Sequence, residues 1–191
     1  MAGMLSNEDR RLIRELRQVG VLKDIENHLL DQRAGTVLVT CADADRFPDI
    51  FHHQEKMQSE QRTSSRIHTL SWHGGAIACA PCSPVNKVKS ADKVFLGQII
   101  DARCEVKTDI PAIALYAHAP CGAAALHHVD LATVIGLQMR VKQKVKSRLR
   151  DYPAAIAPFF HVDYGMSQRT YFLCRTAWEA WANDHGIKIV C

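Results

Sequence analysis

The chain has 191 residues, of which 47% are apolar, and this is enough for one substantial hydrophobic core. We therefore expect a single domain over residues 1–191. The formal charge of +4 is mild and says little about partners. Apolar runs stay well short of the roughly 20 residues that a membrane span requires, so the sequence argues against a membrane protein.

The amino-terminal stretch MAGMLSNEDRRLIREL becomes charged at once and lacks the apolar core of a signal peptide. We expect a cytoplasmic protein. The seven cysteines of such a chain do not indicate a disulfide framework. Reduced thiols are available for metal or redox chemistry, so the positions of the cysteines are the first clue to function.

The first 34 residues are predicted to form two helices. The first begins at Ser6 or Asn7 and ends at Gly20, and the second is short and ends near Gly35. Apolar residues at helical spacing support both, namely Leu12, Ile13, Leu16, Val19, Val21, Leu22, Ile25 and Leu29.

Helical and strand-like segments alternate along the remaining chain, which favours an α/β fold with a mostly parallel central sheet flanked by helices. TVLVT (36–40) and IPAIALYA (110–117) are compact apolar runs typical of buried strands. The other expected elements are a polar helix or long loop (52–66), a weak strand broken by Gly74-Gly75 (67–80), helices (92–106, from 122 onward and 175–185), and paired strands (159–162 and 170–174).

One segment, RVKQKVKSRLR (140–150), is strongly basic. Val141, Val145 and Leu149 form an apolar stripe on it at helical spacing, so the basic residues are expected to be the solvated face of a helix. A nucleic-acid-binding module is the alternative. Trp178 and Trp181 on the last helix are predicted to lie in the core or in a dimer interface.

Two of the expected buried strands end in residues that bind metals. TVLVT is followed by Cys41, and IPAIALYA by His118 and Cys121. Because ligand sites in parallel sheets lie outside the carboxyl ends of the strands, neighbouring strands would bring these three side chains together. Two thiolates and one imidazole are a known zinc set that leaves a fourth position open, as catalytic zinc sites do.

Zinc held by two thiolates and a neutral imidazole carries no net charge, so it needs help to ionise a bound water. Asp43, two residues after Cys41, is placed to accept a hydrogen bond from the resulting hydroxide, or alternatively to bind zinc itself. A nearby arginine would keep Asp43 ionised and oriented, and Arg46 is the nearest in sequence.

Cys79 and Cys82 form a C-x-x-C motif. It could be redox-active or join His118 and Cys121 in a structural zinc site, but no second C-x-x-C accompanies it, which favours simple packing. His73-Gly74-Gly75 is predicted to be either a close backbone approach to a small substrate or a tight turn.

The C-x-D motif after one buried strand and the H-x-x-C-G motif after another resemble the β-class carbonic anhydrases. The resemblance extends from about Thr36 to Cys174. Within the family, the sequence is similar to a divergent branch such as the low-CO₂-inducible algal proteins. It implies that Cys41, His118 and Cys121 bind Zn²⁺ and that Asp43 pairs with an arginine. The family pattern C-x-D-x-R has Asp45 at its last position here, so Arg46 or Arg66 would take this role.

The predicted function is therefore reversible hydration of CO₂ to bicarbonate by a zinc-bound hydroxide, with His73 as a candidate proton carrier. The resemblance also implies a homodimer or higher homo-oligomer with the helix at 7–19 reaching over the partner. A related zinc hydrolase acting on carbonyl sulfide or carbon disulfide, and a non-catalytic zinc-containing sensor or interaction protein, are the alternatives.

Overall fold

A computed structural model describes residues 3–25, 32–59 and 65–188 of the chain. Its elements in chain order are α1 (Asn7–Gln18), β1 (Leu22–Lys23), β2 (Thr36–Cys41), α2 (Phe47–Ser59), β3 (Ile67–Trp72), the 3₁₀ helix η2 (Gly75–Cys79), α3 (Ala91–Asp101), the π-helical turn η3 (Ala102–Val106), β4 (Ala112–Ala119), α4 (Gly122–Leu126), α5 (Leu131–Arg148), β5 (Ala155–Asp163), β6 (Gln168–Leu173) and α6 (Arg175–Asp184).

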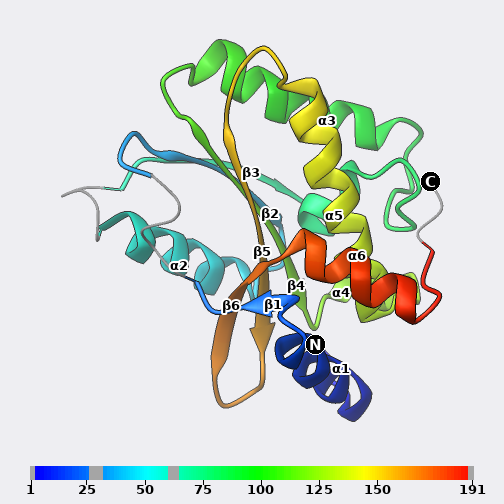
Figure 1. The fold of residues 1–191 in the computed structure, drawn as a ribbon. Coiled ribbons are helices and arrows are strands. Elements are labelled where there is room, and N and C mark those ends of the chain that lie inside the picture. Colours follow the sequence, from blue (N-terminus) through cyan, green and yellow to red (C-terminus); the bar gives the residue numbers. More distant parts are fainter. Residues whose placement is uncertain (1–2, 26–31, 60–64, 189–191) are drawn as a thin grey trace.

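The strands form a six-stranded sheet in the order β1-β6-β5-β4-β2-β3. β2 pairs in parallel with both β3 and β4, and β4 pairs in parallel with β5. β6 and the short β1 complete one edge with antiparallel pairings. The expected α/β fold with a mostly parallel central sheet is confirmed (Figure 1).

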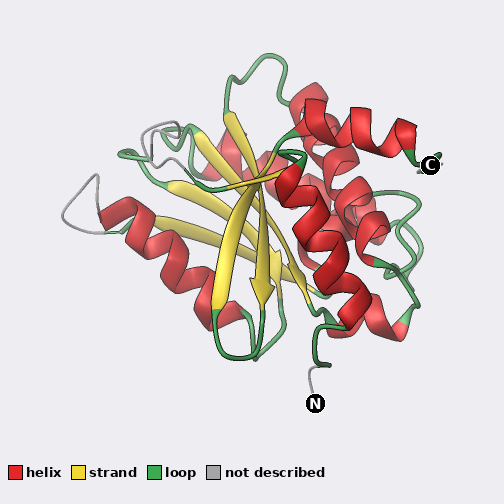
Figure 2. Cartoon of the chain, turned by 60° about the horizontal axis from the view of Figure 1, so that its bottom comes forward, coloured by secondary structure: helices red, strands yellow, loops and turns green. Residues whose placement is uncertain are grey.

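Helices cover both faces of this sheet, in unequal numbers. Figure 2 shows α2 alone on one side and the other long helices gathered on the opposite side. Ile50 and Met57 of α2 pack against Leu38, Tyr116 and Phe159. The larger core contains apolar residues of α1, α3, α5 and α6 together with the opposite faces of the strands. Burial on both faces explains why β2 and β4 are nearly continuous apolar runs.

The amino-terminal segment differs in part from its prediction. α1 forms as expected, with Ser6 and Asp9 in a capping box, and its Ile13 and Leu16 are buried in the core of the same chain. The second helix is wrong for Leu22 and Lys23, which form β1 against β6. Residues 26–31 of that predicted helix lie outside the described residues.

The carboxyl-terminal half matches its predictions closely. The basic segment lies on α5, with Val141, Val145 and Leu149 buried. Trp178 and Trp181 of α6 are buried in the core, 5% and 7% exposed, and the indole nitrogen of Trp181 donates a 2.6 Å hydrogen bond to Glu15 of α1. No helix that the structure describes is both long enough and apolar enough to cross a membrane.

Gly75 provides a direct test of how the end of β2 is held. Its φ is +60°, and a Cβ added there would lie 2.6 Å from the backbone nitrogen of Cys41. We expect Gly75→Ala to lower the free energy of unfolding of the metal-free protein by about 2 kcal/mol or more, measured by chemical denaturation.

Gly97 on α3 is the matched control for this substitution. An added Cβ would meet nothing within 4 Å there, so Gly97→Ala should be neutral or stabilise the protein by about 0.5–1 kcal/mol. Equal losses of stability in the two variants would contradict the close approach of Gly75 to β2.

Candidate metal centre

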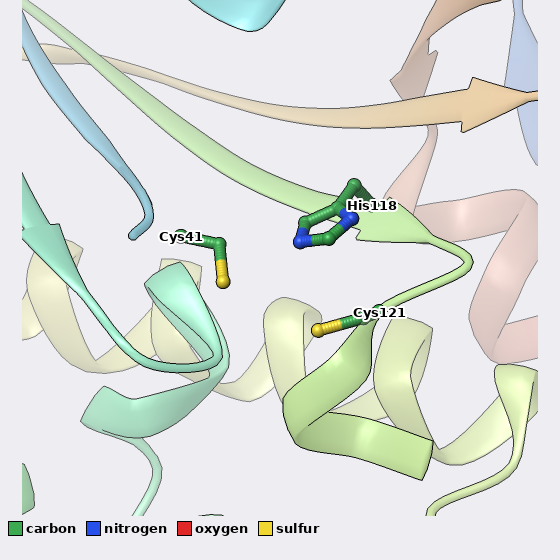
Figure 3. Close-up of side chains that lie close together, drawn as sticks. All are labelled: Cys41, His118 and Cys121. Atoms are coloured by element: carbon green, nitrogen blue, oxygen red, sulfur yellow. The ribbon is translucent and has the colours of Figure 1, made fainter. Parts of the chain in front are cut away.

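The three predicted ligands meet at the carboxyl edge of the sheet. The sulfurs of Cys41 and Cys121 and a ring nitrogen of His118 all lie within 4.8 Å of one another. Figure 3 shows the three side chains pointing into one common space from the end of β2, the end of β4 and the start of α4. All three are buried, with exposed fractions of 3%, 2% and 8% for Cys41, His118 and Cys121.

Parallel pairing explains how residues so distant in sequence converge. Val37 and Val39 of β2 lie opposite Ile113 and Leu115 of β4, so both strands end at the same edge. Cys41 is the last residue of β2, and His118 is the next-to-last residue of β4. Cys121 directly precedes α4.

Main-chain contacts fix the tautomer of His118. Its Nδ1 lies 2.9 Å from the carbonyl oxygen of Pro120, which can only accept a hydrogen bond, so Nδ1 carries the proton. Nε2 is buried and has no hydrogen-bond partner among the described residues. A buried imidazole nitrogen with a free lone pair, beside two sulfurs, fits a metal ligand.

The two thiols interact strongly in the absence of a metal. A hydrogen bond from Cys41 lowers the pKa of Cys121 to about 4, while the same hydrogen bond, together with burial, raises the pKa of Cys41 well above its usual range. The pair therefore holds one proton at neutral pH and carries one negative charge. A divalent cation would displace that proton and bind two thiolates.

The Gly74-Gly75 turn supports Cys41. Gly74 has a φ of +82°, and its N–H donates a 3.3 Å hydrogen bond to the sulfur of Cys41. A glycine is favoured here because an added Cβ would lie 2.9 Å from Val85. The sequence predicted either a substrate approach or a tight turn at this motif. The structure shows a turn whose backbone contacts a candidate ligand.

Asp43 lies beside the three candidate ligands without joining their cluster. A Cβ added to Gly122, next to Cys121, would lie 3.9 Å from Oδ2 of Asp43. Oδ1 accepts a 3.0 Å hydrogen bond from the backbone N–H of Asp45. The carboxylate is therefore oriented by its own turn.

The arginine contact predicted for Asp43 is not formed by either candidate. Arg46 makes its ion pair with Asp163, with 2.8 Å between Nη2 and Oδ2. Arg66 precedes β3 at the opposite edge of the sheet, where it pairs with Asp109. The prediction relied on sequence proximity, whereas the Arg46 side chain extends away from Asp43 to the end of β5. Asp163 was missed because nothing in its local sequence indicates a partner in the loop after β2.

The C-x-x-C motif does not form a metal site. Cys82 is disulfide-bonded, so its sulfur is not free to bind a metal, and the expectation of reduced thiols throughout is wrong at this position. Cys79 is a fully buried free thiol in η2, and burial raises its pKa to about 12. Among the described residues, the only group suited to bind a metal is Cys41, His118 and Cys121.

A neutral histidine lies next to the cluster. His161 of β5 is in register with His118 of β4, and its Nδ1 lies 2.9 Å from the hydroxyl of Thr170. Burial lowers the pKa of His161 to about 4, so its ring is uncharged at neutral pH. A positive charge beside the candidate cation site is thereby avoided.

A cavity of about 610 Å³ is lined by Cys41 of the cluster. Asp43 also lines it, together with apolar side chains that include Trp72, Val85 and Leu126. His73, Lys87 and His127 supply its basic groups. A cavity of similar size, about 650 Å³, lies between α5 and α6, but no cysteine or histidine lines it.

Comparisons with solved structures give distant likenesses to carbonic anhydrases. The β-carbonic anhydrase CcaA has a TM-score of 0.43 and 13% identity, over 87% of this chain and 90% of that one. The β-carbonic anhydrase CafA of the fungal pathogen Aspergillus fumigatus has a TM-score of 0.42 and 13% identity, over 93% and 94%. Carbonic anhydrase from Streptococcus mutans has a TM-score of 0.39 and 14% identity, over 87% and 99%.

No protein-family model and no curated protein sequence matches the chain at a significant level. The three solved structures share 13–14% sequence identity with this chain.

The cluster predicts a specific loss of metal on substitution. We expect Cys41→Ser to weaken zinc binding by more than about 100-fold, beyond the 10–100-fold typical of losing a residue that only orients a ligand. Metal analysis after equilibration with limiting zinc measures the change. Cys79→Ser is the control and should keep full stoichiometry, and zinc loss in that variant but not in Cys41→Ser would refute the ligand set.

The shared proton of the thiol pair predicts the proton release on zinc binding. Because Cys121 is already ionised at pH 7 and Cys41 is not, binding should release about one proton per zinc. Calorimetric titration in buffers of different ionisation enthalpy measures this number. Release of about two protons would show that both thiols are protonated in the metal-free protein.

Proposed function

We propose that this protein is a zinc-dependent carbonic anhydrase that catalyses the reversible hydration of CO₂ to bicarbonate. One observation carries the proposal, namely the buried convergence of two cysteine sulfurs and an unpartnered histidine nitrogen within 4.8 Å of one another, beside a cavity that Cys41 lines. Three ligands leave the fourth position of a tetrahedral zinc for water, which is the arrangement of a catalytic site.

In this proposal Cys41, His118 and Cys121 hold the zinc. A zinc ion bound by them would supply Lewis acidity that lowers the pKa of a coordinated water. The carbonyl of Pro120 keeps the His118 proton on Nδ1, and the N–H of Gly74 donates a hydrogen bond to the Cys41 sulfur. Both contacts come from the backbone, so the ligand geometry does not depend on flexible side chains.

Asp43 orients the nucleophile in this proposal. Its Oδ1 is occupied by the Asp45 N–H, and Oδ2 faces Gly122 beside the cluster, where it can accept a hydrogen bond. An acceptor at this place selects one orientation of the attacking oxygen, which lowers the entropic part of the barrier.

The cavity suits both sides of the reaction. Its apolar walls fit the uncharged CO₂, and Lys87 offers a positive charge to the bicarbonate anion. His73 and His127 also line it, and because an imidazole ring can both accept and donate a proton, they can carry protons between the site and the solvent. We infer a cytoplasmic enzyme that forms a homodimer or higher homo-oligomer, although α1 packs its apolar face on its own chain.

Stopped-flow CO₂ hydration by the zinc-loaded protein tests the proposal. Carbonyl sulfide hydrolysis, measured on the same preparation, separates the related hydrolase from a carbonic anhydrase. A fully loaded protein with neither activity would contradict an enzymatic role and favour a non-catalytic zinc-containing protein.

Within this assay, Asp43→Ala should keep its zinc and lose about 100-fold or more of kcat, because the nucleophile loses its hydrogen-bond acceptor. Asp45→Ala is the control, since the exposed Asp45 takes part in the turn through its backbone N–H and carbonyl, which the substitution keeps. Full activity of Asp43→Ala would remove this carboxylate from the mechanism.

A further inference from the structure

The loop after β2 forms a tight turn that starts at Asp43. The carbonyl oxygen of Asp43 accepts hydrogen bonds from the N–H groups of Arg46 (3.2 Å) and Phe47 (2.8 Å). Its carboxylate accepts the N–H of Asp45 at 3.0 Å. The direction of the Asp43 carboxylate is therefore tied to the position of the 45–47 backbone.

Arg46 fixes that backbone to a distant strand. Its Nη2 lies 2.8 Å from Oδ2 of Asp163, and its Nη1 donates a 3.2 Å hydrogen bond to the carbonyl of Asp45. The two charged side chains are 13% and 10% exposed, so their attraction is only weakly screened by solvent. We call this contact the Arg46–Asp163 bridge.

Asp163 is a rigid anchor for this bridge. It is the last residue of β5, where it pairs with Gln168 of β6, and its Oδ1 accepts a 2.7 Å hydrogen bond from the N–H of Gly165. Both carboxylate oxygens are thus used, one by the hairpin that follows β5 and one by Arg46.

The bridge spans the strand that carries the other candidate ligands. In the sheet, β4 lies between β2 and β5, and it bears His118 and leads directly into Cys121. The loop that follows Cys41 and contains Asp43 is therefore held to β5 across β4. Loss of the bridge would free this loop without removing any candidate ligand.

We propose that Asp163 is a positioning residue that acts through Arg46 to hold Asp43 beside the metal. The role of Asp43 in turnover rests on the proposed function, but its position next to a bound metal does not. In this arrangement Arg46 orients the Asp43 loop through its backbone, and the carboxylate that Arg46 contacts is that of Asp163.

Cobalt substitution tests the position separately from the activity. The visible absorption bands of Co²⁺ bound to the cluster depend on the groups in and around its open position. We expect the Asp163→Asn variant to bind one Co²⁺ per chain, with absorption bands shifted from those of the wild type. In its zinc-loaded form, kcat should be about 10–100-fold lower and the zinc stoichiometry unchanged. Asp163→Glu keeps the charge and should recover most of both properties.

Epistasis with Asp43 gives the sharper test. If Asp163 acts through Asp43, then adding Asp163→Asn to Asp43→Ala should lower kcat by less than about 2-fold further. The cobalt bands of the double variant should lie where those of Asp43→Ala lie. Asp109→Asn is the matched control, because it breaks the ion pair with Arg66 at the other edge of the sheet and should leave both readouts unchanged.

A lower melting temperature of Asp163→Asn with an unchanged cobalt spectrum and unchanged kcat would overturn the proposal and leave the bridge a purely structural contact. Full additivity with Asp43→Ala would overturn it as well. The two proposals can also fail separately. Suppose that the wild-type protein hydrates no CO₂, that Asp163→Asn shifts the cobalt bands, and that adding Asp163→Asn to Asp43→Ala shifts them no further. The proposed function would then be wrong, and the positioning role of Asp163 would stand.

Discussion

The register between β2 and β4 is the constraint on which the candidate metal centre depends. Cys41 and His118 converge only because the two strands run in the same direction and end at the same edge. A slip of one residue would turn His118 to the opposite face of the sheet, and the cluster would be lost. Burial of both faces of β2 and β4 makes such a slip costly, so the hydrophobic core determines the geometry of the polar site.

Charge balance explains how these groups coexist in a buried position. The metal-free thiol pair holds one proton and carries a single negative charge, and His161 beside it adds no charge because it is neutral. A divalent cation with two thiolates and one neutral imidazole has no net charge. Such a metal is a weak Lewis acid, and this gives the placement of a carboxylate beside it particular importance.

The sequence was sufficient to predict the fold class and the three residues that meet, because the apolar runs of buried strands are local patterns and parallel strands collect their ends at one edge. The sequence was not sufficient to predict the ion-pair partner of Arg46, because that partner depends on the direction of a long side chain across two strands. Leu22 and Lys23 were misassigned because an edge strand of two residues is determined by its neighbour β6 rather than by its own residues. The hydrogen bond from the Gly74 N–H to the Cys41 sulfur could not be predicted from residue types, since every residue except proline has this donor.

The carbonyl of Pro120 has a consequence for how this site can change in evolution. Where a side chain fixes the tautomer of a ligand histidine, a single substitution can remove that control. Here the acceptor is the main chain two residues further on, within the same loop that delivers Cys121. The protonation state of His118 is therefore set by the shape of the loop and does not depend on the side chain of a second residue.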